Sequence, residues 1–83
     1  MWEIIWTAEA RKNIKKIDKK NQKRILILLE QCTENPISAT SQLTNSPYRR
    51  LKVGDYRVIM NLIKNKMIIN IIRVRHRKNS YKF

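Results

Sequence analysis

Residues 48–74 contain three runs of β-forming residues separated by two short turns, and this pattern limits the possible fold more than any other feature. The runs are Tyr48–Val53, Tyr56–Ile63 and Met67–Val74. The turns are Gly54-Asp55 and residues 64–66, and Gly54, the only glycine of the chain, is expected to adopt a positive φ. Three strands joined by short turns predict an antiparallel meander.

The first half of the chain predicts a strand followed by two helices. Trp2–Trp6 is rich in β-formers, and Thr7 can cap the helix that follows. Apolar residues then recur at helical spacing, first at Ala10, Ile14 and Ile17, and after a cap at Asp18 or Asn21 at Ile25, Leu28, Leu29 and Cys32. Pro36 disfavours helix at the residue before it and ends the second helix before Asn35.

Residues 35–47 are rich in Ser, Thr, Asn and Pro and read as a loop, with Leu43 as an inward-facing anchor. At 83 residues the chain has room for one core, so we expect a single domain over residues 1–83. The predicted architecture is α+β: an N-terminal strand, a two-helix hairpin and a three-stranded meander, with the helices packed on one face of the sheet. The opposite face is left open.

The net charge of +13 is uneven along the chain. Residues 1–40 hold eight Lys/Arg and five Asp/Glu, whereas residues 41–83 hold eleven and one. Six of the eight arginines fall between positions 49 and 77: Arg49, Arg50, Arg57, Arg73, Arg75 and Arg77. Such a charge repels itself and favours a polyanion or an acidic partner, and arginine suits bidentate contacts to phosphate.

Strand alternation assigns these cations to faces. Leu51 and Val53 are expected to be buried, and Ile68, Ile72 and Val74 are expected to share one face of the last strand. If the helices cover that face, the cations that converge on the open, concave face are Arg50, Lys52, Arg57, Arg73 and Arg77. No carboxylate is expected beside them, because Asp55 lies in a turn. Phosphate backbone is the natural ligand of this surface.

Several other residues have both a structural and a functional interpretation. Cations on a half-covered sheet also simply solvate it. Tyr48 and Tyr81 can stack on bases or pack the sheet edge, and Trp2 and Trp6 suit the core or its rim. Cys32 fits the core and cannot form an internal disulfide, and His76 alone does not make a metal site. The lysine-rich helical segment would solvate the helices and steer polyanions.

No apolar stretch reaches the length of a signal peptide core or a membrane span, so we expect a cytoplasmic protein without a membrane partner.

The strings YRRLKVGDYRVIM and VRHRKNSY, with the G-D-Y-R turn and the V-x-H-R-x-x-x-Y ending, resemble the RelE/ParE superfamily of toxins from type II toxin–antitoxin systems. The resemblance covers nearly the whole chain and implies the order β-α-α-β-β-β. The ending favours the RelE branch, whose members cleave mRNA in the ribosomal A site. The ParE branch, which poisons DNA gyrase, is the alternative.

RelE-like chemistry implies attack of a ribose 2′-hydroxyl on the adjacent phosphodiester, without metal or cofactor. By resemblance, Arg50 and Arg57 would bind the phosphate, Arg77 would stabilise the transition state or protonate the leaving oxygen, and Tyr81 would stack on or activate the nucleotide. Lys52 would contribute charge. The expected RNA-binding residues around this site are Tyr48, Arg49, Arg73, Arg75 and His76. Arginine is a poor general acid, with a pKa above about 12, and the proton acceptor stays open between Lys52, His76 and Tyr81.

The implied partners are the ribosome with its mRNA and a cognate, acidic antitoxin that wraps the toxin. A gyrase-binding inhibitor needs no phosphate chemistry. A third hypothesis is a non-catalytic nucleic-acid-binding module whose affinity falls steeply with salt.

Overall fold

The computed structural model describes residues 1–78. Its elements follow one another as β1 (Glu3–Trp6), α1 (Ala8–Lys15), α2 (Lys19–Cys32), α3 (Pro36–Ala39), β2 (Ser41–Gln42), β3 (Arg49–Val53), β4 (Tyr56–Ile63), the 3₁₀ turn η1 (Lys64–Lys66) and β5 (Ile68–His76). The predicted α+β order of strand, helix pair and meander is confirmed.

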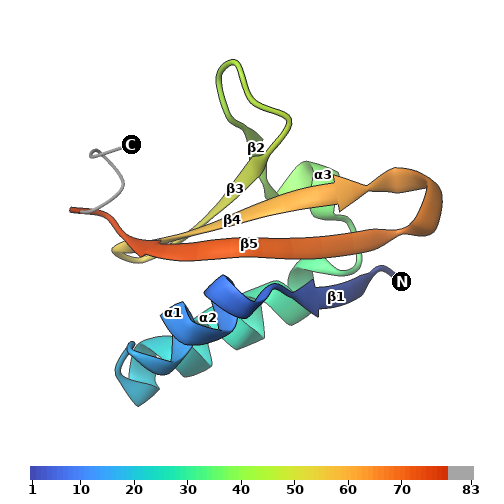
Figure 1. Ribbon diagram of the computed structural model, residues 1–83. Helices are drawn as coiled ribbons and strands as arrows, with labels where there is room; N and C mark the ends of the chain where they lie inside the picture. The colour runs from blue at the N-terminus through green and yellow to red at the C-terminus, as the bar shows by residue number, and fades with distance from the viewer. Residues whose placement is uncertain (79–83) are drawn as a thin grey trace.

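All strands belong to one five-stranded sheet with the order β1-β5-β4-β3-β2. β1 runs parallel to β5, and the remaining neighbours are antiparallel. The first strand thus pairs with the last one. Helices α1 and α2 lie together on one side of the sheet, while the connection between β2 and β3 rises on the other side (Figure 1).

Local signals in the sequence set the helix boundaries. The Thr7 hydroxyl accepts a hydrogen bond from Ala10 N at 3.2 Å and caps α1. Asp18 caps α2, because its carboxylate accepts from Asn21 N at 3.2 Å. Asp18 was one of the two predicted caps for this helix.

The core forms between α2 and the covered face of the sheet. Ile25, Leu29 and Cys32 of the predicted α2 stripe are buried, and they pack against side chains from three strands, Leu51, Val53, Val58, Met60, Ile69, Ile71 and Val74. Trp2 and Trp6 are partly buried against this cluster. The expected burial of Leu51 and Val53 is confirmed.

The prediction of a plain loop over residues 35–47 is wrong. Asn35 caps the short helix α3, and Pro36 occupies its first turn, where a missing N–H costs nothing. Ser41 and Gln42 then pair with Arg50 and Arg49 as strand β2. The connection read as irregular therefore extends the sheet by one short edge strand.

The predicted face of β5 is also wrong. Ile59 pairs with Arg73 but the next residue, Met60, pairs with Ile71, so Ile72 is an extra residue in β5. This β-bulge shifts the alternation by one position. Ile69, Ile71 and Val74 are buried, whereas Ile68 and Ile72 are only half-buried. The same shift turns Arg73 away from the core.

Gly54 has φ +57°, as predicted for the turn between β3 and β4. A Cβ at this position would lie 3.2 Å from Arg24 Nη1. The turn thus packs closely against a side chain of α2, which ties the sheet's hairpin to the helical layer.

Candidate nucleic-acid interface

The open face of the sheet carries cations in rows that cross three strands. Lys52 pairs with Arg57, and Arg57 pairs with Arg75. Neighbouring strands lie about 4.8 Å apart, so these three positive side chains start from adjacent points of the sheet. In the next row, Ile59 lies between Arg50 and Arg73. The rows concentrate positive charge on the face opposite to the helices.

A groove of about 380 Å³ lies over these rows. Its floor includes cations of β3, β4 and β5, and its wall comes from the connection between β2 and β3. The lining residues are Leu43, Thr44, Ser46, Tyr48, Arg50, Arg57, Ile59, Arg73 and Arg75. The structure thus brings together Arg50 and Arg57 of the predicted catalytic set with Tyr48, Arg73 and Arg75 of the predicted RNA-binding set.

The wall of the groove is built by local hydrogen bonds. Leu43 N donates to Tyr48 O at 3.0 Å, and Gln42 Nε2 donates to Ser46 O at 2.6 Å. Asn45 reverses the chain with φ +56°. Leu43, expected to anchor the loop in the core, is half-buried and lines the groove instead. The groove therefore has an apolar contact surface beside its cations.

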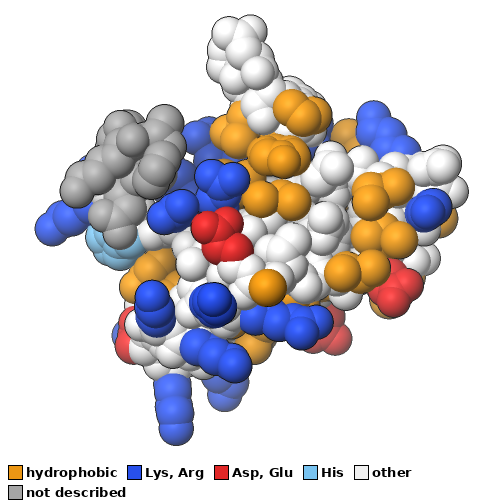
Figure 2. Space-filling view, in the orientation of Figure 1, with side chains coloured by type: hydrophobic (Ala, Val, Ile, Leu, Met, Phe, Trp, Pro, Cys, Tyr) orange, Lys and Arg blue, Asp and Glu red, His pale blue; other side chains and the backbone are white. Residues whose placement is uncertain are grey.

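Positive charge is not confined to the groove. Figure 2 shows Lys and Arg side chains gathered over the helices at the lower left and again above the left half of the sheet. The groove combines such charge with a concave surface of strand residues. The helical cations offer long-range attraction to a polyanion rather than a shaped site.

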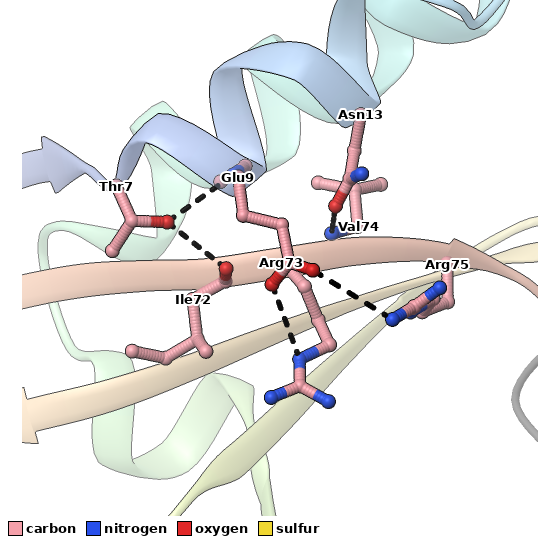
Figure 3. A network of polar contacts seen from close by, with 8 residues as sticks. Thr7, Glu9, Asn13, Ile72, Arg73, Val74 and Arg75 are labelled. Atoms are coloured by element: carbon pink, nitrogen blue, oxygen red, sulfur yellow. Dashed lines mark hydrogen bonds and ion pairs between the residues drawn. The ribbon is translucent and has the colours of Figure 1, made fainter. Parts of the chain in front are cut away.

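One carboxylate lies beside the cations, contrary to expectation. Glu9 Oε2 lies 3.9 Å from Arg73 Nε, and Glu9 Oε1 lies 3.8 Å from Arg75 Nη2 (Figure 3). The side chain of Arg73 is 33% exposed, and its Nε is shielded from solvent and makes no hydrogen bond. Sequence reasoning missed Glu9 because it lies 64 positions before Arg73 along the chain.

Arg49 points away from the groove. Its guanidinium donates to Thr40 Oγ1 at 2.7 Å, to Gln42 Oε1 at 3.0 Å and to the carbonyls of Ile37 and Thr40, each at 3.0 Å. These bonds tie β3 to α3 and β2. They give Arg49 a structural role, and its expected contact with RNA has no support in this geometry.

Two further predicted site residues flank the groove without lining it. Lys52 is exposed and is the cross-strand neighbour of Arg57. Arg77 follows β5, and its backbone N donates to Asp55 O at 2.6 Å. Both lie at the end of the groove that is next to the Gly54 turn. Tyr81, also predicted for the site, lies outside the described residues.

His76 lies on the side of the sheet that faces the helices. It lines a second hollow of about 320 Å³ together with Asn13, Lys16 and Tyr56, and its ring centroid is 5.1 Å from that of Tyr56 at an interplanar angle of 89°. Its Nδ1 accepts a hydrogen bond from Lys78 N at 3.2 Å. His76 is thus an edge-to-face packing partner that does not line the groove.

The pKa values of two groups, in Cys32 and Asp18, are shifted by their structural surroundings. Burial raises the pKa of the Cys32 thiol, which keeps it neutral in the core. Hydrogen bonds from the Asn21 side chain and backbone lower the pKa of the exposed Asp18 carboxyl at the start of α2. Neither residue lines the groove.

Within residues 1–78, no three His, Cys, Asp or Glu side chains gather closely enough to hold a metal ion. None of the helices in that part of the chain has both the length and the apolar character needed to cross a membrane.

Comparison with known families and structures defines the class of protein. Residues 4–81 match the family described as ParE toxin of type II toxin–antitoxin system, parDE. A comparison with curated proteins found no match. The chain belongs to this family of toxins, and thus to the RelE/ParE superfamily.

Solved structures show the same fold. The toxin–antitoxin complex RelBE2 from Mycobacterium tuberculosis contains a chain with a TM-score of 0.85 at 18% identity, covering 92% of this chain and 98% of that one. The intact E. coli RelBE complex contains one with a TM-score of 0.82 at 21% identity, covering 92% and 96%. An archaeal RelE–RelB complex from Pyrococcus horikoshii gives 0.78 at 19%, covering 94% and 97%. The fold is therefore RelE-like.

Proposed function

We propose that this toxin is a ribosome-dependent mRNA endoribonuclease that cleaves by attack of a ribose 2′-hydroxyl on the adjacent phosphodiester. The observation that carries the proposal is the convergence of Arg50, Arg57, Arg73 and Arg75 in one groove on the open face of the sheet. Family membership and the RelE-like fold support it. The site of action would be the cytoplasm, where ribosomes and mRNA are.

The reaction passes through a pentacoordinate phosphorus that carries more negative charge than the substrate. Fixed guanidinium groups aimed at that charge stabilise it more than they stabilise the ground state. Arg57 has a central place, because it pairs with Lys52 on one side and with Arg75 on the other. In the proposal, Arg50 and Arg57 hold the scissile phosphate, while Arg73 and Arg75 hold the backbone of the same strand.

Base recognition is assigned to the groove's uncharged side chains. Tyr48 and Leu43 line the wall above Arg50. An aromatic ring at such a place can stack on an unpaired base. Tyr81 keeps its predicted role of stacking on the nucleotide.

Proton transfer has fewer candidates than the sequence allowed. His76 lies on the side of the sheet that faces the helices, whereas Lys52 lies on the open face beside Arg57, so the proposal assigns proton acceptance to Lys52 or Tyr81. Arg77 lies at the same end of the groove as Lys52, and we assign it the role of stabilising or protonating the leaving oxygen. A site with so weak a general base gains most from a partner that holds the 2′-hydroxyl in line with the phosphate. This is the role that we assign to the ribosome.

The proposal is tested in a cell-free translation reaction in which the 5′ ends of mRNA are mapped by primer extension. Wild-type protein is compared with Arg57→Ala/Arg77→Ala, and with Lys12→Ala/Lys23→Ala as a control that removes the same charge from exposed helical positions. We expect cuts in frame at the A site for the wild type and the control, and none for the first variant. Intact mRNA in all reactions would contradict the proposal.

The alternative is a DNA gyrase inhibitor, and the specific observation in its favour is the match to the family named for ParE toxins. In that case the cationic groove would be a docking surface without chemistry. A gyrase assay that yields linear DNA in the presence of the toxin, with mRNA left intact in translation, would favour this function over cleavage.

We also propose an acidic antitoxin as the regulatory partner. Structures of the same fold were solved as complexes with RelB antitoxins. The net charge of +13 gives this chain a strong attraction to an acidic segment. We expect a small acidic reading frame beside its gene, and co-expression with the product of that frame should abolish growth inhibition and yield a stable complex.

A further inference from the structure

Glu9 brings a negative charge to one end of the cationic groove. Its carboxylate lies between the guanidinium groups of Arg73 and Arg75, at 3.9 Å from Arg73 Nε and 3.8 Å from Arg75 Nη2 (Figure 3). Both arginines line the groove. A carboxylate offers two anionic oxygens to arginine, as a phosphate group of nucleic acid does.

The position of Glu9 is fixed by the docking of α1 on β5. The Thr7 hydroxyl donates to Ile72 O at 2.9 Å, at the bulge, and Asn13 Oδ1 accepts from Val74 N at 3.0 Å (Figure 3). These two bonds clamp the helix alongside the edge of the strand. Glu9 lies between them in the first turn of α1, where the helix dipole favours a negative charge.

The contacts between Glu9 and the arginines are looser than a hydrogen-bonded ion pair. Charge-assisted N–H···O bonds measure about 2.7–2.9 Å, and both distances here are close to 1 Å longer. Arg73 Nε is shielded from solvent and makes no hydrogen bond. The side chain of Glu9 is 52% exposed, so it is free to turn into solvent when another anion arrives.

We propose that Glu9 is a specificity-determining residue of the groove: its carboxylate lies where a nucleic-acid phosphate binds between Arg73 and Arg75, and a strand must displace it to bind. Glu9 thereby weakens the binding of arbitrary single strands. A strand that also engages Arg50 and Arg57 gains enough contacts to displace it. This inference rests on the proposed function in taking RNA as the ligand.

The test measures the affinity of purified protein for a fluorescent, single-stranded oligouridylate over a series of salt concentrations. Glu9→Gln is compared with Glu30→Gln, which removes the same charge from an exposed position of α2. We expect Glu9→Gln to bind about fivefold more tightly at about 0.1 M salt, because a negative charge beside the ligand is removed. Its salt dependence should also steepen by about 0.7, as for one more phosphate neutralised on a single strand.

The affinity of the Glu30→Gln variant should stay within about twofold of that of the wild type. Its charge is on α2, which lies on the side of the sheet opposite to the groove (Figure 1). Equal affinities for the two variants, or weaker binding by Glu9→Gln, would overturn the proposal. Weaker binding would show that Glu9 holds the arginines in place for the ligand. Thermal unfolding checks that the variants fold, and Glu9→Ser provides a second substitution that suits a helix N-terminus.

A double variant tests whether the effect passes through the arginines. In an Arg73→Gln background, the additional Glu9→Gln substitution should tighten binding by only about twofold, because one of the two arginine partners of Glu9 has gone and Arg75 remains. An undiminished fivefold gain would contradict the assigned position.

Failure of this inference is distinguishable from failure of the proposed function. If mRNA is cut in translation reactions but the Glu9 and Glu30 variants bind alike, only the inference fails. If oligouridylate binds and responds to Glu9→Gln while mRNA stays intact, the cleavage proposal fails and Glu9 keeps its role in nucleic-acid binding.

Discussion

Adjacent arginines of β3 have different environments, although the sequence presents them as a pair. Arg49 uses its guanidinium for hydrogen bonds within the chain, whereas Arg50 lines the groove. Strand alternation explains the difference, because neighbouring side chains leave opposite faces of the sheet. The two residues thus allow stability and ligand binding to be separated.

We predict that Arg49→Gln lowers the free energy of unfolding by about 1.5–3 kcal/mol, through loss of partly buried hydrogen bonds to a charged donor. Arg50→Gln should change it by less than about 0.5 kcal/mol but weaken oligouridylate binding roughly five- to tenfold. Urea denaturation and fluorescence anisotropy measure the two effects. The reverse pattern, with Arg49 affecting binding and Arg50 stability, would contradict these assignments.

The Cys32 thiol predicts a pH dependence of stability. Burial raises the pKa of the thiol in the folded state. As the pH rises, the thiol therefore ionises first in the unfolded chain, and this stabilises the unfolded state relative to the folded one. The thiol thus lowers stability only above the ordinary pKa of cysteine. Urea denaturation between neutral and alkaline pH should show a steeper loss for the wild type than for Cys32→Ala. Parallel curves would contradict the burial of a neutral thiol.

At the scale of elements, the bulge in β5 connects the helical layer to the groove. Without the extra residue Ile72, Arg73 would share the core-facing side with Ile71. Thr7 and Asn13 of the α1 region bind the backbone on either side of Arg73. The helix thus holds the strand where its alternation changes.

We expect Asn13→Ala to lower the free energy of unfolding by about 1–2 kcal/mol, because the Val74 amide loses its acceptor in a partly buried place. Gln31→Ala, at an exposed position of α2, should change it by less than about 0.5 kcal/mol. Hydrogen exchange checks the local cause: the Val74 amide should exchange faster in Asn13→Ala than in Gln31→Ala. Unchanged protection of that amide would argue against the contact.

Some elements were predictable from sequence because their signals are local. The α2 stripe, the caps at Thr7 and Asp18, and the Gly54 turn depend on a few consecutive residues. The bulge at Ile72 was not predictable, because the regular alternation of side chains along a strand does not show where an extra residue is inserted. The short helix α3 was missed because the polar composition of its segment outweighed the Asn35-Pro36 start signal. Strand β2 was missed because it is held by a hydrogen bond from Arg49, which lies in another strand.

The candidate site was also predictable only where its signals are local. Arg50 and Arg57 could be assigned to the open face because β3 and β4 alternate regularly around one turn. Glu9, Leu43 and the placement of His76 depend on contacts between segments far apart in the sequence. Such contacts leave no pattern in any single stretch of the chain.

At the scale of the whole molecule, charge governs stability as well as binding. A net charge of +13 on 83 residues repels itself in the folded state. We predict that raising NaCl from about 0.05 M to about 0.5 M increases the melting temperature by roughly 2–5 °C through screening. The variant Lys12→Glu/Lys23→Glu should show a smaller increase. A melting temperature that falls with salt would contradict a repulsive net charge.

The central claim is that the arginine groove promotes attack by a 2′-hydroxyl, and single-turnover cleavage on programmed ribosomes tests it most directly. The mRNA carries ribose or 2′-deoxyribose at the nucleotide that supplies the attacking hydroxyl, and mass spectrometry identifies the product ends. We predict a cyclic phosphate and a free 5′-hydroxyl from the ribose substrate, no cleavage of the deoxy substrate, and no cleavage of either by Arg57→Ala/Arg77→Ala. Cleavage of the deoxy substrate, or no cleavage of the ribose substrate, would contradict the claim.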